Sequence, residues 1–194
     1  TTVSNGLKEL ETVCWVLDIC NAKVNDSCGF HVHMDAAGFN LDTWKNLTLT
    51  YKHLEHLIDA FMPRTRRNNT YCKTLSGVSD ERIKSVRTID GLREVFNNDR
   101  YHKVNFEAYS RHRTVEFRQH SGTTNFTKME NWIRFLNGLI TFAKRSSLPS
   151  RMTLEELPFL DGKQKLFFKL RTKKLADDTD LSFAGWRSDN RRQP

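Results

Sequence analysis

The chain has 194 residues, of which 38% are hydrophobic and 11% aromatic, enough for one domain with a buried core. It carries 31 Lys and Arg against 23 Asp and Glu, a formal net charge of +8. Such a charge favours nucleic acid, acidic membranes, nucleotide phosphates or carboxylates as partners, without choosing among them. No apolar run approaches the roughly 20 residues of a membrane span, and no secretory signal pattern is present. We therefore expect a globular protein with no membrane contact.

The four cysteines, Cys14, Cys20, Cys28 and Cys72, form no CxxC pair. In a chain of this length they are typical of reduced, mostly buried thiols, so we expect a cytoplasmic protein. The first residue is Thr1 rather than methionine. This start indicates either a trimmed chain or an upstream part that was removed.

Helical and strand patterns alternate in the N-terminal part of the chain. Apolar residues at helical spacing predict a first helix, which Ser4 or Asn5 caps. Residues 28–35 then alternate as a strand does. Asp42 opens the clearest helix of the sequence, whose apolar residues recur at steps of three and four until Pro63 stops it.

A polar loop and a short helix follow this long helix. The loop is RTRRNNTYCKTL, and the short helix covers residues 90–97 with Asp90 as its cap. Strands are predicted at Tyr101–Tyr109 and Thr114–His120, joined by the basic turn SRHR. We therefore expect a strand–turn–strand unit in the middle of the chain.

Further helices are predicted after the second of these strands. Thr127 with Glu130 three residues on forms a capping box ahead of an apolar helical stripe. Thr153 with Glu156 repeats this pattern for a shorter helix. Residues 163–175 favour one more helix.

The fold class and the domain boundary follow from this order of elements. Helices alternate irregularly with a few strands, and this favours an α+β fold over a doubly wound one. After Asp177 the composition turns polar. We therefore expect one domain over residues 1–176 and a polar, flexible tail over residues 177–194.

Ionisable residues gather on one face of each of two predicted strands. Because side chains alternate along a strand, each strand has an apolar face for the core and a second face rich in ionisable groups. If the two strands lie in one sheet with these faces aligned, the ionisable groups form a single site. The polar faces comprise Gly29, His31, His33 and Asp35 on the first strand and Glu116, Arg118 and His120 on the second.

These residue types suit a site for a nucleotide and a metal ion. Mg²⁺ or Mn²⁺ binds carboxylate oxygen, and Mn²⁺ also binds imidazole nitrogen. Arginine supplies a planar fork of donors that fits phosphate or carboxylate. Glu116 and Arg118, two apart on a strand, could therefore hold a metal and a phosphate side by side. Gly29 would let a ligand approach the backbone closely.

Each pattern taken alone has a simpler interpretation. A lone HxH pair is more often two surface or core histidines than a pair of ligands, and an ExR pair also fits a cross-strand ion pair. A structural zinc site fits poorly, because Cys28 points away from His31 and His33. The presence of both patterns, each backed by an apolar face, keeps the functional interpretation open.

The order of several motifs resembles that of the amidoligase family. These motifs are CGFHVHMD, a long helix that leads into PRTRRNNTYC, then HKVNF, TVEFRQHSGT and NWIRF, and they span roughly residues 5–145. The family belongs to the carboxylate–amine ligase superfamily, with glutamine synthetase and glutamate–cysteine ligase. The resemblance implies an antiparallel sheet curved around an ATP site, with helices on its outer face.

The resemblance also implies a reaction and a set of site residues. ATP would phosphorylate a carboxylate, and an amine would attack the acyl phosphate to form an amide, with Mg²⁺ or Mn²⁺ neutralising charge. For the segment Arg64–Arg67, a solvated basic loop is an equally good interpretation. The implied residues are Glu116 and Arg118 for catalysis, His31 and Glu116 for the metal, His33, Arg118, Arg64, Arg66 and Arg67 for ATP phosphates, and Asn105 and His120 for the substrate.

The chain departs from the family pattern at its start. Family members begin with a strand of the form GxExE, whose glutamates supply much of the metal cage, and no such strand is present here. With Glu116 and His31 alone the metal site is about half built, and the sheet would expose an edge. We therefore expect an N-terminal segment or a partner chain to complete the sheet.

Two other functions stay open. The net charge of +8 fits a nucleic-acid-binding surface, although Glu116 interrupts the Arg and His cluster and no helix shows one basic face. An inactive amidoligase fold kept for interaction or structure predicts the same architecture without turnover.

Overall fold

A three-stranded antiparallel sheet lies at the centre of the molecule. The computed structural model describes the backbone of residues 3–189 and the side chains of residues 3–178. The strands are ordered β1–β3–β2, so that β1 and β2 flank β3. They comprise β1 (Gly29–Asp35), β2 (Val104–Asn105) and β3 (Thr114–Ser121).

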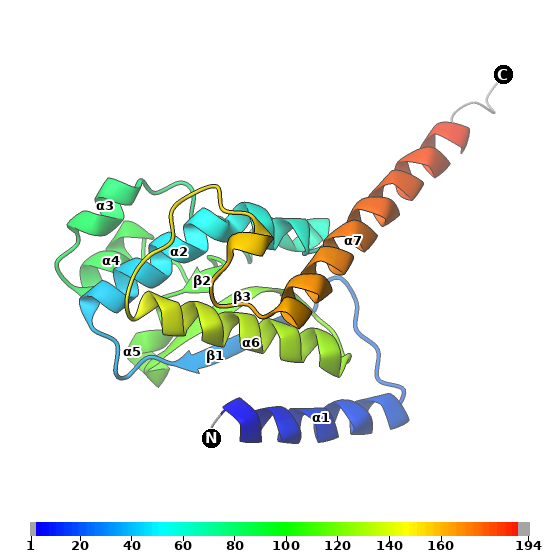
Figure 1. Ribbon diagram of the computed structural model, residues 1–194, viewed down its shortest axis with the longest axis horizontal. Helices are drawn as coiled ribbons and strands as arrows, with labels where there is room; N and C mark the ends of the chain where they lie inside the picture. The colour runs from blue at the N-terminus through cyan, green and yellow to red at the C-terminus, as the bar shows by residue number, and fades with distance from the viewer. Residues whose placement is uncertain (1–2, 190–194) are drawn as a thin grey trace.

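Two long helices cover one face of this sheet and form the core with it. Helices α2 (Leu41–Ala60) and α6 (Phe126–Ala143) lie side by side on this face (Figure 1). Tyr51 of α2 packs against Phe117 of β3, with ring centroids 5.8 Å apart, and Trp132 of α6 is fully buried. Because each large apolar side chain contributes about 1.5–3 kcal/mol when buried, this layer fixes the sheet against the helices.

The remaining elements surround this core. Helix α1 packs against α6, and α7 projects away from the body of the molecule (Figure 1). None of the described helices is long and apolar enough to cross a bilayer. These elements are α1 (Val3–Ile19), η1 (Arg64–Arg66), α3 (Asp80–Ser85), α4 (Ile89–Val95), α5 (Ala108–His112), η2 (Leu154–Glu156) and α7 (Gly162–Asp189).

The structure confirms the α+β class and the two strands that carry the ionisable residues. The strand expected at Tyr101–Tyr109 is reduced to the two residues of β2, however. The expected SRHR turn is wrong, because its residues lie in and directly after α5. That helix ends because Arg113 takes a left-handed conformation, with φ of 56°.

The predicted long helices are present, but several begin at other residues. Asn125 rather than Thr127 caps α6, since its side chain accepts a hydrogen bond from the Lys128 amide. Helix α1 already includes Val3, so neither Ser4 nor Asn5 caps it. Helix α4 is capped by Thr88 rather than Asp90, and helix α3 was not predicted from the sequence. The capping box at Thr153 and Glu156 is confirmed on η2.

The expected flexible tail is helical for most of its length. Helix α7 continues to Asp189, while residues 190–194 lie outside the described part of the chain. No proline follows Pro158 until the last residue, so no proline interrupts this helix. Helix α7 therefore extends beyond the part that packs against α6 and η2.

The cysteines are all free in the described structure. Cys14 and Cys72 are buried, Cys28 is half-buried and Cys20 is exposed. Burial raises the pKa of the Cys72 thiol to about 11, so this thiol stays protonated.

Candidate active site

The register of the three strands builds one row of polar side chains across the sheet. His33 of β1 lies opposite Glu116 of β3, and Asn105 of β2 lies opposite Glu116 on the other side. Asn105 Nδ2 donates to Glu116 Oε2 at 2.6 Å, and His33 Nε2 lies 3.8 Å from Oε1. This row faces away from the layer of α2 and α6, because its neighbours Val115 and Phe117 point into the core.

Arg118 and His31 extend the cluster along the same two strands. Arg118 Nη1 donates to Glu116 Oε1 at 2.7 Å, and His31 Nδ1 lies 3.0 Å from the same oxygen. Arg118 also donates from Nε to the carbonyl of Tyr71 at 3.4 Å. The structure therefore brings His31, His33, Glu116 and Arg118 together, as the strand alternation predicts.

The contacts to Glu116 decide the protonation of its carboxyl group. Glu116 is 6% exposed, and this burial alone would raise its pKa. Hydrogen bonds from His31 and Asn105 and the charge of Arg118 outweigh burial and lower the pKa to about 2. Glu116 is therefore a carboxylate at neutral pH.

The geometry also indicates the tautomer of His31. Its Nδ1 lies 3.0 Å from Glu116 Oε1 and 3.5 Å from Arg118 Nη1, and it cannot both donate to the first and accept from the second. The shorter contact to a carboxylate favours a proton on Nδ1. The Nε2 atom of His31 is then left with a lone pair for a ligand.

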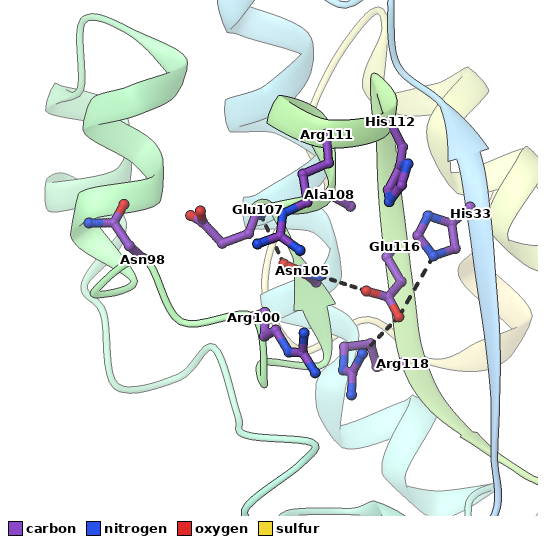
Figure 2. Close-up of a pocket in the computed structure, with 10 residues that line it drawn as sticks. All are labelled: His33, Asn98, Arg100, Asn105, Glu107, Ala108, Arg111, His112, Glu116 and Arg118. Atoms are coloured by element: carbon purple, nitrogen blue, oxygen red, sulfur yellow. Dashed lines mark hydrogen bonds and ion pairs between the residues drawn. The ribbon is translucent and has the colours of Figure 1, made fainter.

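A polar cavity of about 390 Å³ opens beside this cluster. Figure 2 shows its side chains converging from β1, β3, α5 and the loop that precedes β2. A cavity of this size fits a small polar ligand. Its lining comprises His33, Asn98, Arg100, Asn105, Glu107, Ala108, Arg111, His112, Glu116 and Arg118.

Arg100, Arg111 and His112 line the cavity although the sequence patterns did not predict them there. Helix α5 has only five residues, and the left-handed Arg113 turns the chain straight into β3. This sharp connection holds Arg111 and His112 over the start of β3, where the His112 ring lies 5.8 Å from that of His33. The basic segment SRHR indicated that positive charge gathers here, but the sequence did not show that this segment lies over the sheet.

His120 does not join the cluster, which corrects the expectation from strand alternation. Phe30 pairs with His120 but Val32 pairs with Phe117, so β3 carries one extra residue between these pairs. As a result, both Gln119 and His120 point toward the helices. His120 is 3% exposed, its ring lies 5.8 Å from that of Trp132, and burial lowers its pKa to about 4.

The basic segment after α2 does not line the cavity either. Arg66 is buried and donates to the carbonyls of Arg118 and Gln119, so its guanidinium holds the backbone of the β3 bulge. Arg67 donates from Nε to the carbonyl of Met62 at 3.1 Å. Arg64 is exposed. A buried arginine at 66 fits neither a solvated basic loop nor a residue of the cavity wall.

Gly29 leaves the space that the side chains of the cluster occupy. A Cβ atom at this position would lie 2.7 Å from His31 Nε2 and 3.1 Å from Arg66 Nη2. Any side chain would therefore displace the His31 ring. The groups that lie close to the Gly29 backbone are therefore the side chains of His31 and Arg66, where a ligand was expected.

The described residues do not by themselves fit a divalent metal ion. No group of three or more His, Cys, Asp or Glu residues with suitable geometry occurs in the described part of the chain. Glu116 is the carboxylate of the cluster, and hydrogen bonds to His31, Arg118 and Asn105 already engage both of its oxygens. A hard cation such as Mg²⁺ needs further oxygen ligands, which would have to come from outside these residues.

Comparison with known proteins supports a ligase-type enzyme. A family model described as "Putative amidoligase enzyme" matches residues 1–140, which include all three strands and the whole cluster. The chain therefore belongs to the amidoligase family. No curated protein and no solved structure gives a significant match.

Proposed function

We propose that the chain is an ATP-dependent carboxylate–amine ligase that forms an amide through an acyl phosphate. The observation that carries this proposal is the cluster of Glu116, Arg118, His31 and His33, in a chain that belongs to the amidoligase family. Glu116, Arg118 and His33 line the polar cavity, and His31 contacts Glu116 from beside it. Membership of the family supports a ligase, and the polar cavity supports a phosphorylated ligand.

Arg118 is the residue proposed to bind the reacting phosphoryl group. Its Nη1 and Nε atoms already donate to Glu116 and Tyr71, and its side chain lines the cavity. The Glu116 carboxylate fixes the orientation of this guanidinium, so its charge is in place before the ligand arrives. His33, on the same cavity wall, is proposed to contact a phosphate oxygen.

The reaction needs two displacements. An oxygen of the substrate carboxylate attacks the γ-phosphorus, the bond to the ADP oxygen breaks, and an acyl phosphate forms. The amine nitrogen then attacks the acyl carbon, inorganic phosphate leaves, and the nitrogen loses a proton. The positive charge of Arg118 stabilises the oxygens of the transferring phosphoryl group in the first step.

Magnesium or manganese dependence is also proposed, with His31 Nε2 as the ligand that the cluster offers. The metal supplies charge neutralisation at the phosphates when it is bound. The ligands that the cluster lacks are proposed to come from a strand beside β1, which within the described residues pairs with β3 on one side only. A groove of about 560 Å³ borders β1 between α1 and α6, and an upstream segment or a partner chain is proposed to lie there.

The proposal is tested by turnover of the full chain. Purified protein with ATP, Mg²⁺ or Mn²⁺ and a panel of carboxylate–amine pairs is expected to release phosphate and form an amide in equal amounts. Glu116→Gln and Arg118→Gln are each expected to lower kcat/KM by at least about 100-fold, because both residues fix charge at the phosphoryl group. An active chain whose rate is unchanged in both variants would remove these residues from the mechanism.

A non-catalytic role is the second candidate. It is favoured by the fact that Glu116 is fully bonded within the chain and that the described residues make no complete metal site. Under this role, ATP is not turned over with any pair, with or without an added upstream segment. The ligase proposal expects turnover in at least one of these two conditions.

A further inference from the structure

Three arginine side chains from different elements extend into the cavity. Arg118 comes from β3, Arg111 from α5 and Arg100 from the loop before β2 (Figure 2). Arg118 is paired with Glu116. Positive charges held close together repel one another unless carboxylates or a ligand separate them. The positive charges of Arg100 and Arg111 therefore need carboxylates or a ligand nearby.

The carboxylate nearest to Arg111 in sequence is held by another arginine. Glu107 lies four residues before Arg111 at the start of α5, the spacing at which helical ion pairs form. Instead, Arg93 of α4 donates two hydrogen bonds to Glu107, from Nε to Oε1 at 2.9 Å and from Nη2 to Oε2 at 2.5 Å. Among the described residues, Arg111 therefore has no carboxylate partner.

The carboxylate next to Arg100 in sequence, that of Asp99, is likewise bound to other groups. Asp99 forms an ion pair with Lys73 at 2.5 Å, and its second oxygen accepts the amide of Tyr101. The described contact of the Arg100 guanidinium is with the ring of Tyr101, 5.0 Å away. Both cavity arginines are exposed to the solvent in the cavity and lack a counter-ion in the described structure.

The backbone that presents these arginines is in an unusual conformation. Asn97 and Asn98, just before Arg100, have φ values of 58° and 51°, and Arg113, just after Arg111, has 56°. Left-handed residues other than glycine are uncommon and concentrate at functional sites. Both arginines thus lie next to tight turns, one with two left-handed asparagines and one with a left-handed arginine.

We propose that Arg100 and Arg111 form a second anion-binding subsite, separate from the phosphoryl group held by Arg118. Two guanidinium groups without counter-ions match the oxygens of a phosphate or a carboxylate. The inference deepens the proposed function and rests on it for the reaction that the subsite serves. The bound group is then either another phosphate of the nucleotide or a second carboxylate of an acidic substrate.

Equilibrium binding to the full chain tests the subsite without any turnover. Calorimetric titration at low ionic strength uses inorganic tripolyphosphate as the phosphate probe and glutarate as the dicarboxylate probe. Arg100→Gln and Arg111→Gln are each expected to weaken one of the two probes by about 10- to 100-fold, the effect of losing a charged hydrogen-bond donor. Arg111→Lys keeps the charge without the fork, so a smaller loss is expected.

A matched control separates this effect from the loss of net charge. Arg145→Gln removes one exposed arginine that does not line the cavity, and its probe affinities are expected to equal those of the unchanged chain. A loss for tripolyphosphate alone assigns the subsite to the nucleotide, and a loss for glutarate alone assigns it to the substrate. If Arg100→Gln and Arg111→Gln behave as Arg145→Gln does, or if the unchanged chain binds neither probe, the subsite is rejected.

The proposed function is judged by a different measurement. A chain that forms no amide but loses probe affinity in Arg111→Gln would keep the subsite and reject the ligase. A chain that forms an amide while both arginine variants bind the probes normally would keep the ligase and reject the subsite.

Discussion

Glu116 connects three side chains from the three strands of the sheet. Its two oxygens bind His31 of β1, Arg118 of its own strand β3 and Asn105 of β2. At the scale of single residues, the charge and the position of this carboxylate therefore decide the geometry of the whole cluster. Because its pKa is lowered, the contribution of Glu116 to stability can be measured as a function of pH.

The stability of the protein is expected to depend on the ionisation of Glu116. Because the folded pKa of about 2 lies below the ordinary value of 4.5, this group stabilises the fold above pH 4.5 and loses that contribution as pH falls toward 2. The contribution is on the order of 3 kcal/mol. Urea unfolding between pH 2.5 and 6 is expected to show a shallower pH dependence for Glu116→Gln than for the unchanged chain. Equal slopes in the two proteins would contradict this assignment.

Substitution of Gly29 is expected to affect the site more than the fold. In Gly29→Ala the new methyl group would lie 2.7 Å from His31 Nε2, so the imidazole, whose side chain is 34% exposed, has to move. We expect the ligase activity to fall by at least about 10-fold while the free energy of unfolding changes by less than about 1 kcal/mol. Gly77→Ala is the control, since its Cβ would meet no atom within 4 Å and should leave both quantities unchanged.

Among the elements, the bulge in β3 determines which residues enter the site. The extra residue lets Arg118 face the cavity while Gln119 and His120 both face the helices. Arg66 of η1 donates to the carbonyls of Arg118 and Gln119, the two residues within this irregularity. Gln119 in turn binds Tyr51 at 2.7 Å, which ties the bulge to α2.

Removal of the Arg66 guanidinium is expected to loosen the bulge and move Arg118. Arg66→Ala leaves two carbonyls without their donors in a buried region, so we expect a loss of about 2–4 kcal/mol in stability. Because Arg118 then loses its fixed position, kcat/KM is also expected to fall at temperatures where the variant stays folded. Arg67→Ala removes one hydrogen bond away from β3 and should lower stability by about 1 kcal/mol without changing kcat/KM. Normal kcat/KM in folded Arg66→Ala would show that the bulge keeps its shape without this residue.

At the scale of the whole molecule, a buried ionic network joins the sheet to α2. The Lys103 side chain is 1% exposed, and its Nζ atom lies 2.7 Å from Asp59 Oδ1 and 3.6 Å from Glu55 Oε2. Glu55 also accepts hydrogen bonds from the segment around Leu75. Burial raises the pKa of Asp59, and the hydrogen bond and charge of Lys103 oppose this shift.

Loss of the lysine in this network is expected to destabilise the entire domain. Lys103→Met leaves two carboxylates close together without a cation, and we expect a loss of about 3–5 kcal/mol in the free energy of unfolding. Adding Asp59→Asn removes one of these charges and should recover part of the loss. Chemical unfolding of the single and double variants measures this coupling, and additive losses would contradict a shared network.

Local patterns in the sequence determined which residues lie on the polar faces of β1 and β3. The alternation in residues 28–35 and 114–118 was enough to place His31, His33, Glu116 and Arg118 on polar faces, because the side-chain direction in a regular strand depends only on position. The helical stripe of α2 was equally visible, since burial of one face requires apolar residues at steps of three and four.

Only the tertiary structure decided how these faces combine. The bulge that turns His120 to α6 arises from pairing between β1 and β3, and nothing within β3 alone marks it. Arg66 and Arg111 are both arginines in basic segments, yet one is buried against backbone carbonyls and the other opens into the cavity. The sequence determines local conformation through the sterics and spacing of neighbouring residues. The roles of His120, Arg66 and Arg111 depend instead on which residues distant in sequence lie beside them and form hydrogen bonds or ion pairs with them.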